Sequence, residues 1–265
     1  MSPHLKIENL TMKYEDRTVL NEINLEFVGG ELTAIVGSNG SGKTTLLKVL
    51  SGLKQLDEGQ VLLNGKNIKS ISRKNLARQI AVLTQREELQ LDLTVEELVW
   101  HGRHPHQSLF KQQTMKDREA VDKAMEAANI KHFAKRRLTK LSEGERQRAW
   151  IALTLAQEPH ILILDEPTNF LDLGHQVKIL SLLEELNRDN GITIIVVLHD
   201  LTLAGRFAQR IIGLDNGFVA FDGAPKDVLE REILEKVFGT SMLILEEPQT
   251  GEPIPLPLLK HHENN

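Results

Sequence analysis

A glycine-rich octapeptide at residues 37–44, GSNGSGKT, constrains the fold of this chain more than any other stretch. It matches the pattern G-x-x-x-x-G-K-[ST], follows the apolar run LTAIV and precedes the helix-forming sequence TTLLKVL. Glycines at these positions let backbone N–H groups close around an anion without clashes from Cβ atoms. A plain glycine turn before a helix is the structural alternative, but the full match with suitable flanks favours a phosphate-binding loop. The octapeptide therefore predicts a strand–loop–helix unit in an α/β protein.

The same loop carries the side chains that a nucleotide phosphate site needs. Lys43 supplies a positive charge for the β- and γ-phosphates. The Thr44 hydroxyl suits Mg²⁺, a hard ion that prefers oxygen ligands. The residues expected to line the nucleotide site are Gly37, Ser38, Asn39, Gly40, Ser41, Gly42, Lys43, Thr44 and Thr45.

An acidic pair follows a second apolar run, ILILD at residues 161–165. Because α/β sheets bind ligands at the carboxyl ends of their strands, Asp165 is expected to hold Mg²⁺ through water. Glu166 points elsewhere and is expected to polarise an attacking water. Taken alone, this stretch could equally be a solvated acidic pair in a turn. The presence of the phosphate-binding loop in the same chain favours the metal-binding and catalytic interpretation.

Two further polar side chains end apolar runs. His199 follows ITIIVVL, where a histidine can hydrogen-bond a γ-phosphate, and Gln85 ends AVLTQ. Taken alone, the histidine is better explained as a satisfied residue at a strand edge, and a lone glutamine carries almost no signal. Their interpretation depends on the rest of the pattern.

A second anion site is predicted far downstream of the first. Ser142-Glu143-Gly144-Glu145 has the form of a capping box, and the apolar-rich run AWIAL follows it. In this box Glu145 can bond back to the backbone N–H of Ser142. Because the start of a helix binds anions, the chain carries two candidate phosphate sites.

The remaining pattern predicts one α/β domain with two additions. Short runs before residue 36 and the hairpin VLLNGKNI favour an antiparallel β subdomain, and the pattern over about 88–158 is helical. The apolar runs ILILD and ITIIVVL suit strands buried on both faces of a parallel sheet. We therefore expect a P-loop NTPase core with an antiparallel β subdomain and an inserted helical subdomain, within a single domain at 1–240. From Pro225 on, the sequence predicts one amphipathic helix and then a loose, proline-containing tail at 241–265.

Composition excludes several function classes. The net charge of the 265 residues is −5, so no broad basic field is expected and nucleic acid is not predicted as a partner. There is no cysteine, which excludes disulfides and thiolate chemistry. No apolar run is long enough for a membrane span, and the first residues lack the apolar core of a signal peptide.

Together these features resemble the ATP-binding subunits of ABC transporters, over residues from about 5 to 238. Six motifs occur in the order of that family. In its terms they are Walker A at 37–44, the Q-loop glutamine Gln85, the signature motif at 141–145, Walker B at 161–165 with the catalytic glutamate Glu166, the D-loop at 169–172, and the switch histidine His199. Tyr14 stands where the family places an aromatic ring on adenine, although an ordinary strand aromatic is the alternative.

The resemblance implies the ABC ATPase fold, with ATP and Mg²⁺ as ligands. Two copies of the chain would pair head to tail and hold ATP between Walker A of one copy and the signature helix of the other. Ser142 and Gly144 would then face the partner's γ-phosphate, and Asp172 would contact the partner's P-loop region. The implied catalytic residues are Glu166, His199 and Gln85, and the implied metal-binding residues are Thr44, Gln85 and Asp165.

The signature motif departs from the family pattern LSGGQ, because Glu143 and Glu145 replace Gly and Gln. Two carboxylates near a triphosphate repel it by roughly a few tenths to a few kcal/mol, depending on the local dielectric. A tolerated variant is the favoured interpretation, since the helix start is preserved. Weaker ATP-driven dimerisation is the alternative.

The resemblance narrows to the ATPases of importers for ferric siderophores, haem and cobalamin, and within these to ferric hydroxamate importer ATPases of the FhuC type. A separate single ATP domain is the importer arrangement, and GRHPH at residues 102–106 and LDLGHQ at residues 171–176 fit this group. The implied partners are transmembrane permease subunits, a second copy of this chain and, indirectly, a substrate-binding protein. The implied location is the cytoplasmic face of the cell membrane, as a peripheral subunit.

Several alternatives stay open at this point. Haem or cobalamin import, a regulatory ABC ATPase that never meets a permease, and a non-catalytic ATP switch all fit parts of the pattern. His101, His104 and His106 also suggest a metal site, but Pro105 interrupts a regular helical spacing of ligands. Ordinary surface histidines are therefore favoured.

Overall fold

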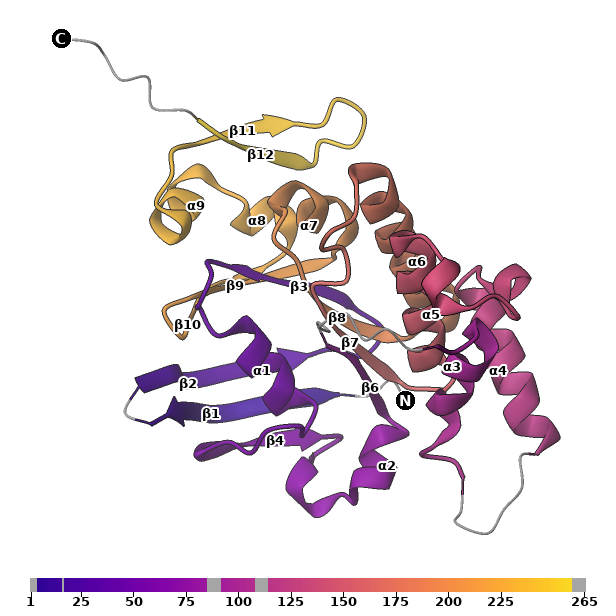
Figure 1. The fold of residues 1–265 in the computed structure, drawn as a ribbon. Helices are drawn as coiled ribbons and strands as arrows, with labels where there is room; N and C mark the ends of the chain where they lie inside the picture. The colour runs from indigo at the N-terminus through magenta and orange to yellow at the C-terminus, as the bar shows by residue number, and fades with distance from the viewer. Residues whose placement is uncertain (1–3, 16, 85–91, 108–113, 259–265) are drawn as a thin grey trace.

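The computed structural model describes residues 4–15, 17–84, 92–107 and 114–258. A six-stranded sheet runs through its centre, in the spatial order β10-β9-β3-β8-β7-β6, with β10 antiparallel at one edge and the other strands parallel (Figure 1). The strands are β3 Leu32–Gly37, β6 Ile80–Leu83, β7 Ile161–Asp165, β8 Thr193–Val197, β9 Arg210–Asp215 and β10 Phe218–Gly223. Every residue of β3, β7 and β8 is buried, because both faces of the sheet are covered.

A second, antiparallel sheet lies against one face of this core. Its order is β2-β1-β4-β5, and its strands are β1 Leu5–Tyr14, β2 Arg17–Phe27, β4 Glu58–Leu63 and β5 Lys66–Asn67. The expected hairpin is present, with Asn64 and Gly65 at φ 51° and 76° between paired strands β4 and β5. Helix α1, Lys43–Leu50, fills the space between the two sheets, since its apolar side chains share one core with both.

Helices cover the opposite face of the six-stranded sheet (Figure 1). Between β6 and β7 the chain forms a helical insertion, which confirms the expected fold class. The helices on this face are α3 Val95–Trp100, α4 Met115–Ala127, α5 Glu143–Leu155, α6 Leu173–Asn190 and α7 Leu201–Phe207, joined by one-turn segments at His101–Arg103 (η2), Lys131–Phe133 (η3) and Leu138–Lys140 (η4). Short turns at Ile68–Ser70 (η1) and Arg73–Ala77 (α2) precede β6. None of the helices in the described ranges is long and apolar enough to cross a bilayer.

The C-terminal region differs from the expectation of one helix and a loose tail. It forms two helices, α8 Pro225–Val228 and α9 Arg231–Phe238, and then a hairpin of β11 Met242–Glu246 and β12 Pro253–Pro257. The Pro255 carbonyl of β12 faces away from β11 and accepts a hydrogen bond from the Thr202 hydroxyl of α7 over 3.4 Å. The other prolines of β12 stand two residues before and after Pro255, so their backbones face the same side of the strand. Because the missing proline N–H groups lie on this outer edge, they cost the hairpin no ladder bonds. Proline content therefore misled the prediction for residues 241–258.

Candidate functional site

The loop between β3 and α1 adopts a conformation that only glycine tolerates at two positions. Gly42 has φ 104°, and a Cβ atom there would lie 2.7 Å from the Leu20 side chain. Gly37 has φ 150°, and a Cβ atom there would lie 2.2 Å from the Leu214 carbonyl oxygen. Gly37 and Gly42 are thus required both by backbone conformation and by close packing, whereas Gly40, at φ 81°, is favoured by its backbone conformation alone.

Lys43 is held inside this loop. Its Nζ atom donates to the carbonyl oxygens of Gly37 and Ser38, at 2.8 and 2.9 Å, and the residue is 6% exposed. Burial lowers the pKa of Lys43, while the carboxylates of Glu166 and Asp165 act in the opposite direction. The ammonium is therefore oriented but poorly solvated, so an anionic ligand would stabilise its charged form.

Two side chains with oxygen atoms that could bind a metal ion, Thr44 and Asp165, are hydrogen-bonded to each other beside Lys43. The Thr44 hydroxyl of α1 donates to Asp165 Oδ1 at the end of β7, over 3.3 Å. Asp165 is 4% exposed, and burial raises the pKa of its carboxyl, with the Thr44 bond opposing the shift and the charge of Glu166 adding to it. A hydroxyl and a buried carboxylate at this spacing fit a hard divalent cation, as the sequence predicts.

Glu166 is held by one contact from its own turn and by one from another segment. Its backbone has φ 53°, an uncommon conformation for a residue with a side chain. His199, which follows β8, places Nε2 2.7 Å from Glu166 Oε1, and Asn169 Nδ2 donates to Glu166 Oε2. The structure thus brings the predicted base and the predicted γ-phosphate sensor into direct contact.

Lys43, Thr44 and Glu166 line a cavity of about 200 Å³. Its lining residues are Val19, Asn39, Gly40, Gly42, Lys43, Thr44, Thr45 and Glu166. Within the described residues, the Ser41 hydroxyl is a buried side-chain oxygen without a hydrogen-bond partner. A buried polar group left without a partner is costly, but Ser41 is not among the residues that line the cavity. The cavity fits the phosphates of a nucleotide because the Lys43 ammonium and the Thr44 hydroxyl line it.

The remaining predicted residues of this region have different outcomes. Tyr14 is 41% exposed at the end of β1, and the ammonium of Lys54 lies 3.2 Å from the centre of its ring. The bond to Lys54 lowers the pKa of Tyr14, and the Thr45 hydroxyl acts in the same direction. Tyr14 therefore lies close to α1, with one ring face covered by a cation. Gln85 lies outside the described residues, so its predicted role stays a prediction.

The second predicted anion site is a capped helix start. The Ser142 side chain accepts from the backbone N–H of Glu145 over 3.4 Å, and Glu145 Oε2 accepts from Ser142 N over 2.8 Å. That backbone bond lowers the pKa of Glu145. Glu143 pairs instead with Arg146. Each of the two unexpected carboxylates therefore has a partner within its own helix turn.

The two anion sites lie on opposite faces of the central sheet. Alternate residues of β7 show this, because Ile161 and Ile163 pack in the core that contains α1, whereas Leu162 and Leu164 pack in the core that contains α5. Figure 1 shows the same separation, with α1 and α5 on either side of β7. Neither Ser142 nor Gly144 is among the residues that line the cavity beside α1.

Asp172 caps α6, next to the second anion site. Its Oδ1 accepts from the His175 backbone N–H at 2.9 Å, and its Oδ2 lies 2.7 Å from His175 Nδ1. These bonds lower the pKa of Asp172, so its carboxylate is held in the charged form. The other edge of the His175 ring packs on Gly144, where a Cβ atom would lie 2.5 Å from Cδ2.

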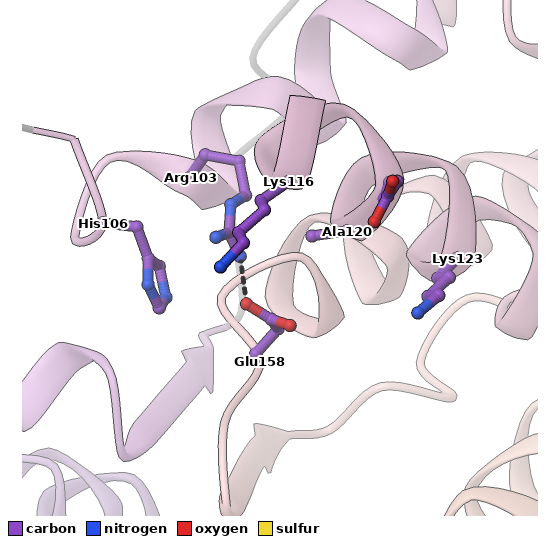
Figure 2. Close-up of a pocket in the computed structure, with 7 residues that line it drawn as sticks. Arg103, His106, Lys116, Ala120, Lys123 and Glu158 are labelled. Atoms are coloured by element: carbon purple, nitrogen blue, oxygen red, sulfur yellow. Dashed lines mark hydrogen bonds and ion pairs between the residues drawn. The ribbon is translucent and has the colours of Figure 1, made fainter. Parts of the chain in front are cut away.

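The GRHPH segment has a structural explanation in the helical insertion. A Cβ atom at Gly102 would lie 2.2 Å from the Leu153 carbonyl oxygen, so glycine lets η2 pack against α5. Arg103 is 4% exposed and binds Asp117 at 3.0 Å and Glu158 at 2.8 Å. Figure 2 shows it beside a cavity of about 390 Å³, across which the basic side chains of α4 project. The motif thus joins η2, α4 and the end of α5.

The side chains of His101, His104 and His106 do not point toward a common centre. His101 Nδ1 and His104 Nε2 are 3.3 Å apart and their rings stack, whereas His106 Nε2 lies 2.8 Å from the Gln157 carbonyl oxygen. This arrangement agrees with their treatment as ordinary side chains.

The sequence analysis placed three of these residues within motifs but assigned none of them a role of its own. Asn169 orients Glu166, His175 orients Asp172, and Arg103 joins the insertion. Both of the first two stand three residues after their carboxylate partner, a spacing that places side chains together in a turn. Arg103 had no comparable signal, because its acidic partners are distant in sequence.

Comparison with known proteins extends the picture to the whole chain. The family model described as ABC transporter matches residues 20–169. The ferric enterobactin transport ATP-binding protein FepC of Escherichia coli K12 is 45% identical over 254 residues, which are 96% of this chain and 94% of FepC. The iron(3+)-hydroxamate import ATP-binding protein FhuC of Bacillus subtilis is 42% identical over 94% of this chain and 93% of FhuC.

Solved structures give the same result. A putative metal-chelate type ABC transporter in an inward-facing conformation superposes with a TM-score of 0.86 at 27% identity, over 98% of this chain and 99% of that chain. The dimeric cassette MJ0796, described as a bacterial ABC transporter cassette, superposes with a TM-score of 0.72 at 31% identity, over 83% of this chain and 98% of that chain. This chain therefore belongs to the ABC transporter family, as one of its ATP-binding and ATP-hydrolysing subunits.

Proposed function

We propose that this chain powers the import of iron(III)–siderophore complexes across the cytoplasmic membrane, as a peripheral ATPase subunit docked on transmembrane permease subunits. The observation that carries the catalytic part is the position of Glu166, which lines the phosphate cavity and is held there by His199 and Asn169. A carboxylate placed in this way can act on a water next to a bound γ-phosphate.

We assign each step of ATP hydrolysis to residues in and around the cavity. Lys43 and the loop N–H groups bind the β- and γ-phosphates, and Glu166 accepts a proton as the water oxygen attacks the γ-phosphorus and the bond to the bridging oxygen breaks. His199 holds Glu166 before the nucleotide arrives and then contacts the γ-phosphate. Thr44 and Asp165 are placed to hold Mg²⁺, with Gln85 as a further ligand. When bound, Mg²⁺ neutralises negative charge on the phosphate oxygens.

The complete site requires a second copy of the chain. α1 and α5 lie on opposite faces of the sheet, and neither Ser142 nor Gly144 lines the cavity beside α1. We therefore infer that these two residues contact the γ-phosphate of a nucleotide that another copy of the chain holds. The segment beside Asp172 also exposes apolar side chains, with Phe170 89% and Leu173 65% exposed, as a surface that is buried in an assembly would. The MJ0796 cassette is dimeric in its solved structure, which supports the same arrangement here.

The cargo is inferred from the relatives. FepC is named for ferric enterobactin and FhuC for iron(3+)-hydroxamate, at 45% and 42% identity to this chain. These values support ferric siderophores as a class, and they do not separate one siderophore chemistry from another. A substrate-binding protein would deliver the chelate to the permease and would not touch this subunit.

Uptake of labelled iron chelates by cells that lack the gene tests the whole proposal. Catecholate, hydroxamate and carboxylate siderophores, haem and cobalamin would each be offered, with wild-type or Glu166→Gln copies put back. We expect uptake of one siderophore class to disappear and only the wild-type copy to restore it. Normal entry of every siderophore, with loss of haem or cobalamin uptake instead, would contradict the iron–siderophore assignment.

The purified protein tests the catalytic part separately. The Glu166→Gln variant should bind ATP and form dimers, while hydrolysis falls by about 10²-fold or more because the proton acceptor is lost. Hydrolysis at the wild-type rate would show that Glu166 is not the base.

A further inference from the structure

Gly144 is a glycine that its own backbone does not require. It lies in the first turn of α5 and has no left-handed φ, so a residue with a Cβ atom could adopt its conformation. Alanine would also be the better helix former at this position. The space around the position explains the glycine, because a Cβ atom would lie 2.5 Å from Cδ2 and 3.2 Å from Cγ of His175.

The His175 ring cannot move aside without a loss. Its Nδ1 atom is 2.7 Å from Asp172 Oδ2, and its backbone N–H donates to Asp172 Oδ1 over 2.9 Å. A rotation that cleared a Cβ atom at Gly144 would break the side-chain bond to Asp172. One imidazole therefore joins the signature helix start to the D-loop carboxylate.

We propose that His175 is a positioning residue that fixes Asp172 relative to the first turn of α5, and that the glycine at 144 serves this contact within the chain. The inference rests on the proposed ATP-bound dimer, in which both segments face the partner's nucleotide. If the two segments must reach the same partner site together, their relative position has to be set before the chains meet. His175 is partly exposed, with 43% of its side chain accessible, so it lies next to the surface that it organises.

The contact between His175 and the two segments depends on the Nδ1–H donor of the ring and on the space that Gly144 leaves by having no Cβ atom. Imidazole donates from Nδ1 to the charged Asp172 carboxylate, a bond strengthened by the charge. An asparagine at position 175 would carry an amide N–H close to the Nδ1 position, whereas an alanine would carry none. An alanine at 175 would also leave room for a Cβ atom at position 144. The asparagine and alanine variants therefore distinguish a positioning role of His175 from a role in packing alone.

A double-mutant cycle with ATP hydrolysis as the readout tests the proposal. The variants are Gly144→Ala, His175→Ala, their combination and His175→Asn, with His160→Ala as the control because His160 is exposed just before β7, away from the catalytic end of the strands. ATP binding to the monomer would be measured for each, since the P-loop is untouched. ATP-driven dimerisation would be measured in a Glu166→Gln background by sedimentation velocity.

We expect Gly144→Ala to lower kcat and dimer affinity by about tenfold, His175→Ala by a smaller factor, and the double variant to return to the level of His175→Ala. His175→Asn should stay within about twofold of the wild type, because its amide retains the donor to Asp172. Monomer binding of ATP should not change. A double variant as impaired as Gly144→Ala, or impaired by the product of both effects, would overturn the proposal and place the demand for glycine on the nucleotide or the partner.

The nucleotide-free monomer provides a readout that does not depend on the proposed function. The Nδ1–H proton of His175 should give an NMR signal that is shifted downfield by its bond to Asp172 and lost in Gly144→Ala. Persistence of that signal in Gly144→Ala would overturn the inference even if hydrolysis changed. If the wild-type protein formed no ATP-dependent dimer but the signal behaved as expected, the dimer would be wrong and the link between Gly144, His175 and Asp172 would stand.

Discussion

The P-loop region and the signature region both bind anions in our account, but the chain prepares them in opposite ways. In the P-loop region, burial lowers the pKa of Lys43 and raises that of Asp165, so both groups are shifted toward neutrality. In the signature region, bonds from backbone N–H groups of the same chain lower the pKa of Glu145 and of Asp172, which favours their charged forms.

The difference shows which region needs a ligand. The buried charges of the P-loop region gain most from a nucleotide and its metal ion, which supply opposite charges in a poorly solvated site. The exposed groups of the signature region are already hydrogen-bonded, and they offer a surface of fixed shape. In the proposed dimer, one chain binds ATP and the signature region of a second chain contacts the bound ATP.

The largest predicted contrast is between Lys43→Ala and Ser142→Ala. Loss of the Lys43 ammonium should weaken ATP binding to the monomer by about a hundredfold or more, because a charged hydrogen-bond donor is removed from a buried site. Ser142→Ala should leave that affinity unchanged and cost about 1 kcal/mol of folding stability through the lost helix cap. Titration with a fluorescent nucleotide and urea unfolding would measure the two effects. Equal losses of ATP affinity would break the division between the regions.

A mixing experiment tests whether the regions act across two chains. Lys43→Ala should lack hydrolysis, and Ser142→Asp should lack it too because its carboxylate repels the phosphate while still capping the helix. Each mixed dimer would contain one intact composite site, so a mixture should regain part of the wild-type rate that neither variant has alone. If the mixture stays as inactive as its components, the sites are not shared in this way.

Glu143→Gln and Glu145→Gln sharpen the account of the signature region. Because Glu143 pairs with Arg146 and Glu145 binds the Ser142 backbone, we expect each change to alter ATP-driven dimerisation by less than about threefold, as exposed charges usually do. The measurement is the dimer dissociation constant in a Glu166→Gln background. A gain of tenfold or more would show that the two carboxylates do weaken the dimer.

The smallest predicted effects are on stability, and they have opposite signs. Asp165 has a raised folded-state pKa, so stability falls as pH rises from the ordinary aspartate value of 3.8 through that pKa, and Asp165→Asn should stabilise the nucleotide-free chain at pH 7. Asp172 has a lowered pKa, so its contribution is present above 3.8 and is lost as pH falls, and Asp172→Asn should destabilise the chain at pH 7. Thermal unfolding should show shifts of a few degrees at most, and each should shrink toward acidic pH. Shifts of the same sign would contradict this assignment of the two carboxyls.

The sequence predicts the P-loop region well because its chemistry follows the chain locally. A strand, a glycine turn and a helix put Lys43 and Thr44 in place, and the end of the apolar run ILILD puts Asp165 beside them. The capping box at Ser142 is equally local, and its expected bond from the Ser142 backbone to Glu145 is present.

What the sequence did not predict depends mostly on segments that meet only in the fold. His199 reaches Glu166 from the end of another strand, and the ring of His175 meets Gly144 of another helix. The prediction for the hairpin of β11 and β12 was wrong for a further reason. Proline argues against a strand, unless its backbone is known to face away from the partner strand, as it does here toward α7.

The placement of α1 and α5 on opposite faces of one sheet has a consequence in terms of mass action. If no single chain contains a complete catalytic site, the specific activity of the free protein rises with its own concentration and vanishes on dilution. Attachment of two copies to one permease pair would replace that dependence with a fixed effective concentration. ATP hydrolysis would then be confined to assembled transporters, without any separate inhibitor of the unassembled subunit.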